Sequence, residues 1–506
     1  MAIITIDQLK QENASRLVEQ GKLVRLARGI YSDEVRKSPE QIVRESWREI
    51  LGRTMPGAVI TDRSGFSGHP VDGHLFVHHP RTRVIELPGL TIVPAKGLPA
   101  QPGDVKLGND VFLASEQRAL VDNARATRSK NGLPSRTLSK AEMHDHIVHL
   151  NTTRTPVQRQ RLLDAVSEYA SQTQKPSASA DVTAFFNSAA GKLPTMKSKS
   201  KAMRAAQSGN GFDQRRVQMF TTLAEKLEAE PPRIRPARAD RPLLPFFESY
   251  FSNYIEGTEF TVEEAAEIAF HGHIPEYRPA DAHDIAGTYR IVNDRAEMEA
   301  DLSSYEAFRE ALRRRHRAVM EGRPERGPGQ FKTANNRAGL TEFVAAEHVE
   351  GTLREGWEIL DGIRDPFARS AYMMFFVSEV HPFTDGNGRL ARIMMNSELS
   401  RAGQTRVIIP TVLHLEYLST LTSLTHNGRA DGLITVLDFA QRYTAQTDFS
   451  TLESATQMLT ATNAFEESAT AAERGKRIIL PSQLPLGWEF AEPDQNRGVA
   501  DPSLSD

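Results

Sequence analysis

The chain has 506 residues, of which 39% are hydrophobic and 25% are charged, and its formal net charge is −3. This length exceeds one ordinary hydrophobic core, so we expect roughly two to four domains. A charge this close to zero gives no global electrostatic reason to expect nucleic acid or membrane as a partner. Cysteine is absent, which excludes disulfides, thiolate metal ligands and thiol nucleophiles.

The sequence predicts no targeting or membrane segment. Its first residues lack a basic leader followed by an apolar run, so we expect no signal peptide. The most apolar window, AYMMFFV (371–377), is far shorter than the roughly 20 residues that cross a bilayer. We therefore expect a cytoplasmic protein without a membrane partner.

Residues 1–58 predict a helix followed by a small hairpin. Apolar residues recur at helical spacing up to Val18, Gly21 interrupts the pattern, and KLVRLARGIYS (22–32) predicts two strands around a turn. A helix followed by a basic hairpin suits the second half of a winged helix-turn-helix that binds DNA. A purely structural hairpin with solvated charges is the alternative.

Residues 59–135 contain short apolar runs between Pro and Gly, which predict the strands of a small α/β region. Four histidines fall here, and a metal site with Asp72 is conceivable, but their spacing matches no ligand pattern and favours histidines at strand edges. These histidines are His69, His74, His78 and His79.

Residues 136–230 look helical and include a basic run at 197–204. The proline-rich PPRIRPARADRP (231–242) predicts a semi-rigid linker, and we place the main domain boundary there. From 243 to 485 the pattern is helix after helix, interrupted by GPGQFKTANNRAGLTEFV (327–344), which predicts a β-hairpin. We expect 486–506 to be disordered.

One loop carries most of the chemistry: HPFTDGNGRLAR (381–392), between an apolar helix and a second helix. It opens a helix N-terminus, where unpaired N–H groups accept anions. Gly386 and Gly388 leave room for a phosphate, and the side-chain amide of Asn387 can donate to it. Arg389 and Arg392 are three residues apart and share a helix face, which suits a polyphosphate.

Two further residues indicate the reaction. Asp385 would repel an anion unless Mg²⁺ bridges its carboxylate and the phosphates. His381 can act as a general base near neutral pH, whereas Phe383 suits a core anchor that fixes the loop. The set predicts transfer of part of a nucleotide to a hydroxyl.

The loop matches the Fic signature H-x-F-x-[DE]-G-N-G-R-x-x-R at every specified position, and the resemblance covers roughly 243–445. It implies a mainly α protein in which an all-helical core carries a β-hairpin flap, preceded here by the winged-helix-like and α/β regions. It also implies transfer of AMP from ATP to a Ser, Thr or Tyr hydroxyl of a target protein.

The resemblance assigns roles by position. His381 would be the base and Asp385 the Mg²⁺ ligand. Arg389 and Arg392 would hold the β- and γ-phosphates, above an anion hole formed by Gly386, Asn387 and Gly388. The hairpin at 329–344 would be the flap that clamps the target, and Tyr417 would lie near the nucleotide. The first arm of this flap would carry Phe331, Lys332 and Thr333.

A second motif, SNYIEG (252–257), resembles the inhibitory helix [ST]-x-x-x-E-[GN] of the same family. On that resemblance Glu256 pairs with Arg392 and occupies the γ-phosphate position. A carboxylate placed there consumes the cation and repels the incoming phosphate. The plainer alternative is an exposed glutamate in a capping turn.

The N-terminal part resembles AbiEi-type antitoxins, which are transcriptional regulators of toxin–antitoxin systems. Three segments in chain order carry this resemblance: GKLVRLARGIYSD (21–33), ITDRSG (60–65) and ASEQRALVD (114–122). It implies DNA as a further partner and a regulator fused to a modifying enzyme. An interaction module that recruits the target is the alternative.

Three functions stay open on sequence grounds beside adenylyl transfer. Glu256 and His381 could together remove AMP, or the domain could use another nucleotide donor. The chain could also be a DNA-binding regulator whose Fic-like domain senses ATP. The resemblance also leaves a homodimer open.

Overall fold

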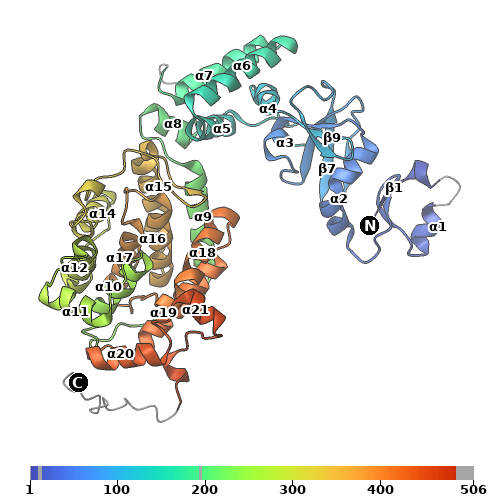
Figure 1. Cartoon of the computed structure of the whole chain (residues 1–506). Coiled ribbons are helices and arrows are strands. Elements are labelled where there is room, and N and C mark those ends of the chain that lie inside the picture. Colours follow the sequence, from blue (N-terminus) through green and yellow to red (C-terminus); the bar gives the residue numbers. More distant parts are fainter. Residues whose placement is uncertain (1, 10–13, 131, 193–196, 486–506) are drawn as a thin grey trace, which may run out of the picture. The chain divides into compact units, whose positions relative to one another are not determined.

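A computed structural model describes residues 2–9, 14–130, 132–192 and 197–485, and the chain divides into two compact units between Gly211 and Phe212 (Figure 1). The predicted tail at 486–506 lies outside the described residues. Among the described helices, none is long and apolar enough to cross a membrane.

The first unit begins with a three-stranded antiparallel sheet in the order β1-β3-β2. Its elements are β1 (Ile3–Thr5), α1 (Ala14–Glu19), β2 (Val24–Ala27), β3 (Ile30–Ser32) and the following α2 (Pro39–Thr54). The predicted hairpin is therefore present, since β2 pairs with β3. Ile42 and Ile50 of α2 are 0% exposed and join one core with Ile3 of β1.

A six-stranded mixed sheet follows in the order β6-β7-β5-β4-β9-β8, with α3 (Asp62–Ser67) and α4 (Glu116–Asn123) beside it. The pairs β4–β9 and β5–β7 are parallel and the other neighbours are antiparallel. This confirms the predicted α/β region. The strands are β4 (Val59–Ile60), β5 (His74–His78), β6 (Ile85–Leu87), β7 (Leu90–Ala95), β8 (Val105–Gly108) and β9 (Val111–Leu113).

Four helices complete the first unit, as the sequence predicts for this stretch. Ser139 and Thr155 form capping boxes with Glu142 and Gln158, which satisfies the first N–H groups of two of these helices. The helices are α5 (Lys140–Thr153), α6 (Pro156–Gln172), α7 (Pro176–Ala189) and α8 (Lys201–Gln207).

The second unit is helical, and α15, α16 and α17 lie together in it (Figure 1). Residues 372–377 of α16 are all 0% exposed, because this helix is apolar on every side and forms the centre of the core. The helices are α9 (Gln214–Ala229), α10 (Leu244–Ile255), α11 (Val262–His271), α12 (Pro279–Asn293), α13 (Arg295–Met298), α14 (Tyr305–Val319), α15 (Val349–Gly362), α16 (Pro366–Val380), α17 (Asn387–Arg401), α18 (His414–Asn427), α19 (Asp431–Gln446), α20 (Leu452–Ala461) and α21 (Ser468–Glu473).

The predicted linker at 231–242 is instead packed on the second unit. The N–H of Arg235 donates to Gln404 at 2.7 Å, and the guanidinium of Arg241 donates to the Thr444 carbonyl at 2.7 Å. Upstream of this segment, Phe220 of α9 packs edge to face on Phe376 of α16, 5.2 Å between ring centroids. The division between the units therefore falls before α9. Hydrogen bonds from Arg235 and Arg241 fix the proline-rich segment, and its lack of apolar residues gave no sign of this packing.

The predicted hairpin is present and short, with β10 (Arg337–Ala338) paired to β11 (Thr341–Glu342) around Gly339, whose φ is +55. Phe331, Lys332 and Thr333 were expected on its first arm, but they precede the strand. The Lys332 N–H donates to the Pro382 carbonyl at 2.9 Å, so the loop at 381–392 uses the backbone group that a strand partner would need.

Candidate active site

His381 ends α16 in the left-handed region, with φ 51, and Pro382 prevents the helix from continuing. Its Nδ1 lies 3.1 Å from the Ser378 carbonyl, so Nδ1–H donates and Nε2 is left as the acceptor. The ring stacks on Phe343 at 3.6 Å and 4°. Burial lowers the pKa of His381 to about 4, so the imidazole is neutral at pH 7, as a base must be.

The loop after His381 is held by the side chain of Asn387. Its Oδ1 accepts from the Phe383 N–H and its Nδ2 donates to the Phe383 carbonyl, both at 2.9 Å. The amide uses its oxygen and one N–H inside the loop, and donation to an anion by its second N–H stays a prediction. Gly386 then starts α17 with φ 73 and no side-chain cap, so no N-cap side chain accepts from the backbone N–H groups of the first turn.

A residue that the sequence analysis missed, His316 of α14, joins this loop to the segment before the hairpin. Its Nδ1 accepts from the Gly329 N–H at 2.8 Å, and its Nε2 donates to the Asp385 carbonyl at 2.9 Å. The ring stacks on Phe383 at 3.7 Å and 5°. The signal was present in the sequence: His316 sits four residues after Leu312, on the buried stripe of an amphipathic helix.

Asp385 keeps one carboxylate oxygen turned from the loop. Its Oδ1 accepts from the Gly386 N–H at 2.7 Å. Its Oδ2 lies 3.9 Å from Nε of Arg326, which is too far for a hydrogen bond. With a side chain that is 39% exposed, Asp385 can offer an oxygen to a hard cation at the entrance of the loop.

Glu256 and Arg392 meet as the sequence predicted. Nη2 of Arg392 lies 2.7 Å from Oε1 of Glu256, and Nε donates to the Ser252 hydroxyl at 2.9 Å. A Cβ placed on Gly388 would collide with Oε1 of Glu256. The carboxylate therefore lies on the N-terminus of α17, where an anion would bind.

Arg389 takes a different partner. Its Nη1 lies 2.5 Å from Oδ2 of Asp284 on α12, and the residue is 3% exposed. Nη1 of Arg389 also lies 3.5 Å from Oδ1 of Asn253 on α10, the helix that carries Ser252, the partner of Arg392. Asp284 therefore neutralises part of the charge of Arg389, and the expectation that Arg389 holds a phosphate stays a prediction.

The predicted target-binding residues lie beside the loop. Phe331 packs against Phe383 with ring centroids 5.2 Å apart. Nζ of Lys332 donates to Oδ1 of Asn336 at 2.7 Å, and burial lowers the pKa of Lys332 to about 8. Thr333 is exposed. Thr333 is therefore open to solvent, whereas Phe331 and Lys332 support the loop.

Tyr417 is 1% exposed beside Arg392. Burial raises the pKa of its phenol. The resemblance places Tyr417 near the nucleotide, and in the structure Tyr417 lies close to Arg392, the arginine that pairs with Glu256. Its hydroxyl lies 3.3 Å from the Met374 sulfur.

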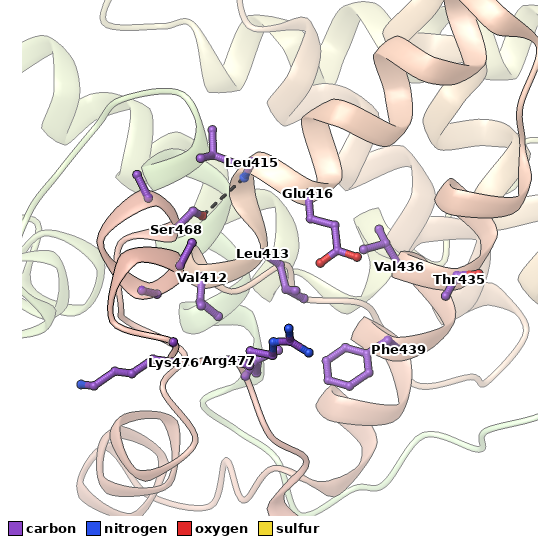
Figure 2. Close-up of a pocket in the computed structure, with 15 residues that line it drawn as sticks. Val412, Leu413, Leu415, Glu416, Thr435, Val436, Phe439, Ser468, Lys476 and Arg477 are labelled. Carbon is purple, nitrogen blue, oxygen red and sulfur yellow. Dashed lines mark hydrogen bonds between the residues drawn. The ribbon is translucent and has the colours of Figure 1, made fainter.

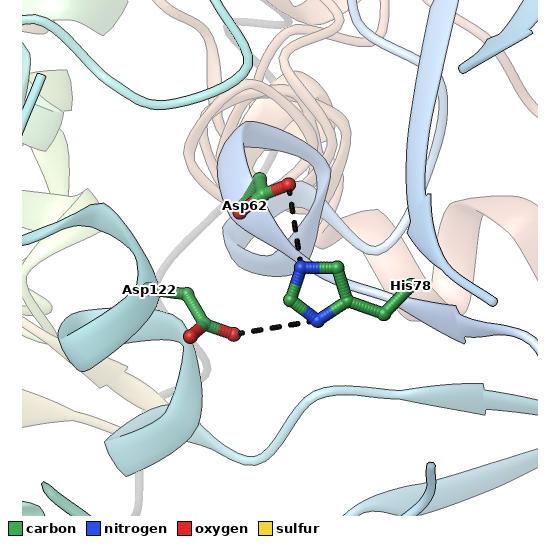
Figure 3. Close-up of side chains that lie close together, drawn as sticks. All are labelled: Asp62, His78 and Asp122. Carbon is green, nitrogen blue, oxygen red and sulfur yellow. Dashed lines mark ion pairs between the residues drawn. The ribbon is translucent and has the colours of Figure 1, made fainter. Parts of the chain in front are cut away.

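The histidines of the first unit form no site with Asp72. His78 lies between two other carboxylates, with Nε2 3.8 Å from Asp62 and Nδ1 3.9 Å from Asp122 (Figure 3). Both carboxylates already have cations, since Arg136 lies 2.6 Å from Asp62 and Lys175 2.8 Å from Asp122. The ring nitrogens of His69, His74 and His79 instead contact backbone carbonyl oxygens.

A hollow of about 770 Å³ opens between α18, α19 and α21 (Figure 2). Val412, Leu413 and Phe439 contribute to its apolar lining, and the Leu415 N–H donates to the Ser468 hydroxyl at 3.4 Å across its edge. No residue of the loop at 381–392 lines it. The chemical groups of this unit therefore gather at the start of α17 and not in this large hollow.

Comparison with known proteins gives the domain its class. Residues 306–399 match the model of the Fic/DOC family, a stretch that includes the loop at 381–392 and leaves Glu256 outside. The chain therefore carries a Fic domain, as the sequence predicts.

Curated relatives share this part of the chain. Protein adenylyltransferase fic-1 of Caenorhabditis briggsae is 34% identical over 110 residues, 21% of this chain and 22% of that protein. Protein adenylyltransferase Fic of Drosophila persimilis is 25% identical over 231 residues, 42% of this chain and 43% of that protein. The chain thus spans between about a fifth and under half of these relatives. The solved structure of Fic-1 from C. elegans aligns with a TM-score of 0.36 and 19% identity, over 60% of this chain and 90% of that chain.

Proposed function

We propose that this protein transfers AMP from ATP to a hydroxyl side chain of a target protein. The observation that carries the proposal is the meeting of a neutral imidazole, His381, with the anion-binding N-terminus of α17 on one loop. That loop belongs to a domain whose curated relatives are named protein adenylyltransferases.

In the proposed reaction Nε2 of His381 accepts the proton of the target hydroxyl. The hydroxyl oxygen bonds to the α-phosphorus, and the bond from that phosphorus to the oxygen bridging the β-phosphate breaks, so pyrophosphate leaves. The stack on Phe343 and the hydrogen bond to Ser378 fix the ring so that Nε2 is the nitrogen presented to the target.

The phosphates would contact the first-turn N–H groups of α17 and the guanidinium of Arg392. Gly386 and Gly388 allow the backbone to approach them, and Asn387 keeps the loop in shape from inside. Arg389 supports α17 through Asp284, and its other donors would contact a phosphate.

The residues present fit a Mg²⁺ ion that accompanies ATP. Asp385 supplies an oxygen that makes no close contact with Arg326, and Mg²⁺ is commonly held by one or two carboxylates together with substrate phosphates. When bound, the ion would neutralise charge on the phosphates. Asp385 would hold it.

We further propose that Glu256 inhibits the transfer. Its carboxylate consumes the charge of Arg392 and covers Gly388, so it competes with a phosphate for both the cation and the space. Ser252 strengthens the arrangement, because its hydroxyl and its carbonyl both accept from Arg392, at 2.9 and 2.8 Å.

The test supplies ATP labelled on the α- or the γ-phosphate, with Mg²⁺ and cell lysate, to the Glu256→Gly protein. We expect protein-bound label from the α position only, and none when His381→Ala is added. Label from the γ position would indicate phosphoryl transfer, and absence of α-label would contradict adenylyl transfer to the proteins present. The control Glu259→Gly changes an exposed glutamate near Glu256 and should leave the wild-type level unchanged.

Binding of the target as an added strand on the hairpin, DNA binding by the first unit, a homodimer and a cytoplasmic location stay predictions. Removal of AMP, another donor and a purely regulatory role stay alternatives that the labelling test also addresses. A gel shift with the full chain and its own promoter DNA tests the DNA prediction.

A further inference from the structure

The hairpin is held by an arginine far upstream of it. Nη2 of Arg216 on α9 donates to the carbonyl of Glu342, in β11, at 2.5 Å. Nε of the same side chain donates to Oε1 of Glu379 on α16 at 2.9 Å. Arg216 is 9% exposed, so one buried guanidinium ties the second strand of the hairpin to the central helix.

Glu379 makes this tie specific. It is 3% exposed, and its other oxygen accepts from the Thr425 hydroxyl of α18 at 2.7 Å. A buried carboxylate is expensive to leave unpaired, so Arg216 is fixed on Glu379. Its Nη2 then points at the hairpin, and its Nη1 lies 3.7 Å from Oδ2 of Asp213. Arginine suits this position because its rigid fork presents two separate nitrogens to two acceptors, whereas a lysine offers a single nitrogen.

Both ends of the tie lie next to the proposed base. Glu379 is two residues before His381, and Glu342 is followed directly by Phe343, whose ring lies 3.6 Å from that of His381. The Phe343 N–H also donates to the Asn336 carbonyl at 3.3 Å, across the base of the hairpin. A shift of β11 would therefore move the ring that orients His381.

We propose that Arg216 is a positioning residue that fixes β11, and through it Phe343, against His381. The consequence for catalysis rests on the proposed adenylyl transfer, whereas the anchoring of the hairpin does not. Arg216 lies outside the 306–399 stretch that matches the family model and only a few residues after the division of the chain at Gly211. The segment before the matched domain thus completes its active site.

Other side-chain ties also hold the hairpin: Nδ2 of Asn336, at its base, donates to the Phe383 carbonyl at 3.0 Å, and Thr341 makes a contact at its outer end. Oγ1 of Thr341 lies 2.8 Å from Nε2 of His426, in an exposed position. An exposed hydrogen bond contributes little beside a buried, charged one. Release of Arg216 should therefore loosen β11 although Thr341 keeps its partner.

The experiment uses the full chain and three variants: Arg216→Met, Arg216→Lys and the control Arg215→Met, which changes the exposed neighbour on the same helix. Hydrogen exchange of residues 336–344 and tryptic cleavage after the exposed Arg337 report on the hairpin. We expect Arg216→Met to raise both rates by about 10-fold, with exchange in α17 changed by less than about 2-fold. The control should match the wild type.

Unchanged exchange and cleavage of the hairpin in a folded Arg216→Met protein would overturn the proposal. A uniform rise that includes α16 and α17 would overturn it too, because that reports general loss of stability. If Arg216→Met does not fold, Arg216→Lys decides. It keeps a charge beside Glu379, and its hairpin must still exchange faster than that of the control.

The catalytic consequence is measured in the Glu256→Gly background with α-labelled ATP and lysate proteins. We expect Arg216→Met to lower transfer about 10-fold while the affinity for a fluorescent ATP analogue changes less than about 2-fold, because Arg216 contacts no proposed phosphate ligand. Equal loss of transfer and nucleotide affinity would contradict a positioning role. If the Glu256→Gly protein transfers no label at all, the proposed function fails, and the exchange data still decide whether Arg216 anchors the hairpin.

Discussion

Replacement of Glu256 by Gly should release the enzyme, and the structure sets the size of the effect. The substitution removes the carboxylate that lies 2.7 Å from Arg392 and clears the space over Gly388. Glu256 sits at the C-terminal end of α10 with φ −90 and ψ 9, a conformation that Gly adopts without strain. The helix itself should therefore persist.

The expected increase in the transfer rate follows from the interaction with Arg392 that becomes free for the phosphate. A hydrogen bond to a charged group contributes about 1.5–3 kcal/mol, and ATP must displace that interaction in the wild type. Its removal corresponds to a roughly 10- to 150-fold increase in transfer at limiting ATP, at 1.36 kcal/mol per factor of ten. Glu256 has a side chain that is 29% exposed, which favours the lower part of this range.

The assay measures initial rates of α-label transfer against ATP concentration for wild type, Glu256→Gly and Glu256→Gln. The Gln variant keeps the size of the side chain and removes its charge, so it separates steric from electrostatic blocking. We expect Gln to fall between the other two. Equal rates for wild type and Glu256→Gly would refute the reasoning, because the ion pair would then not weaken the binding of ATP.

Three further predictions follow from the same contacts. In the Glu256→Gly background, Gly388→Ala should lower the affinity for ATP at least about 10-fold, because the new methyl fills the phosphate cradle; unchanged affinity by titration would contradict the cradle. Burial lowers the pKa of His381 to about 4, so the base is neutral above that value and transfer should show no loss near pH 6.5; a rate profile with its midpoint there would contradict the assignment. Burial also lowers the pKa of His316 to about 4. Between pH 4 and the ordinary pKa of 6.5 the unfolded chain then binds more protons than the folded chain, so the free energy of unfolding should fall as pH drops through this window. The fall should be smaller in His316→Gln. Equal pH dependence of the two proteins in urea unfolding would contradict this prediction.

The sequence predicted the loop at 381–392 from local spacing, whereas it predicted the contact of Glu256 with Arg392, which are 136 residues apart, from the resemblance of SNYIEG (252–257) to an inhibitory helix. A helix start with two glycines places its N–H groups in one direction whatever surrounds it. The contact needed only that α10 pack beside α17, which the inhibitory motif implied.

Other parts depend on partners that no spacing reveals. Asp284 pairs with Arg389 from another helix, and Arg216 reaches the hairpin across 126 residues of sequence. The segment at 231–242 was taken for a linker because it lacks apolar residues, yet Arg235 and Arg241 dock it through hydrogen bonds. Hydrogen bonds to groups this distant in the sequence leave no periodic pattern.

The most direct test of the central claim is mass spectrometry of proteins modified by Glu256→Gly with ATP and Mg²⁺. The account predicts AMP attached through its phosphate to a Ser, Thr or Tyr oxygen, and no such adduct with the Glu256→Gly/His381→Ala protein. A phosphate without the nucleoside, or an adduct that persists without His381, would contradict it.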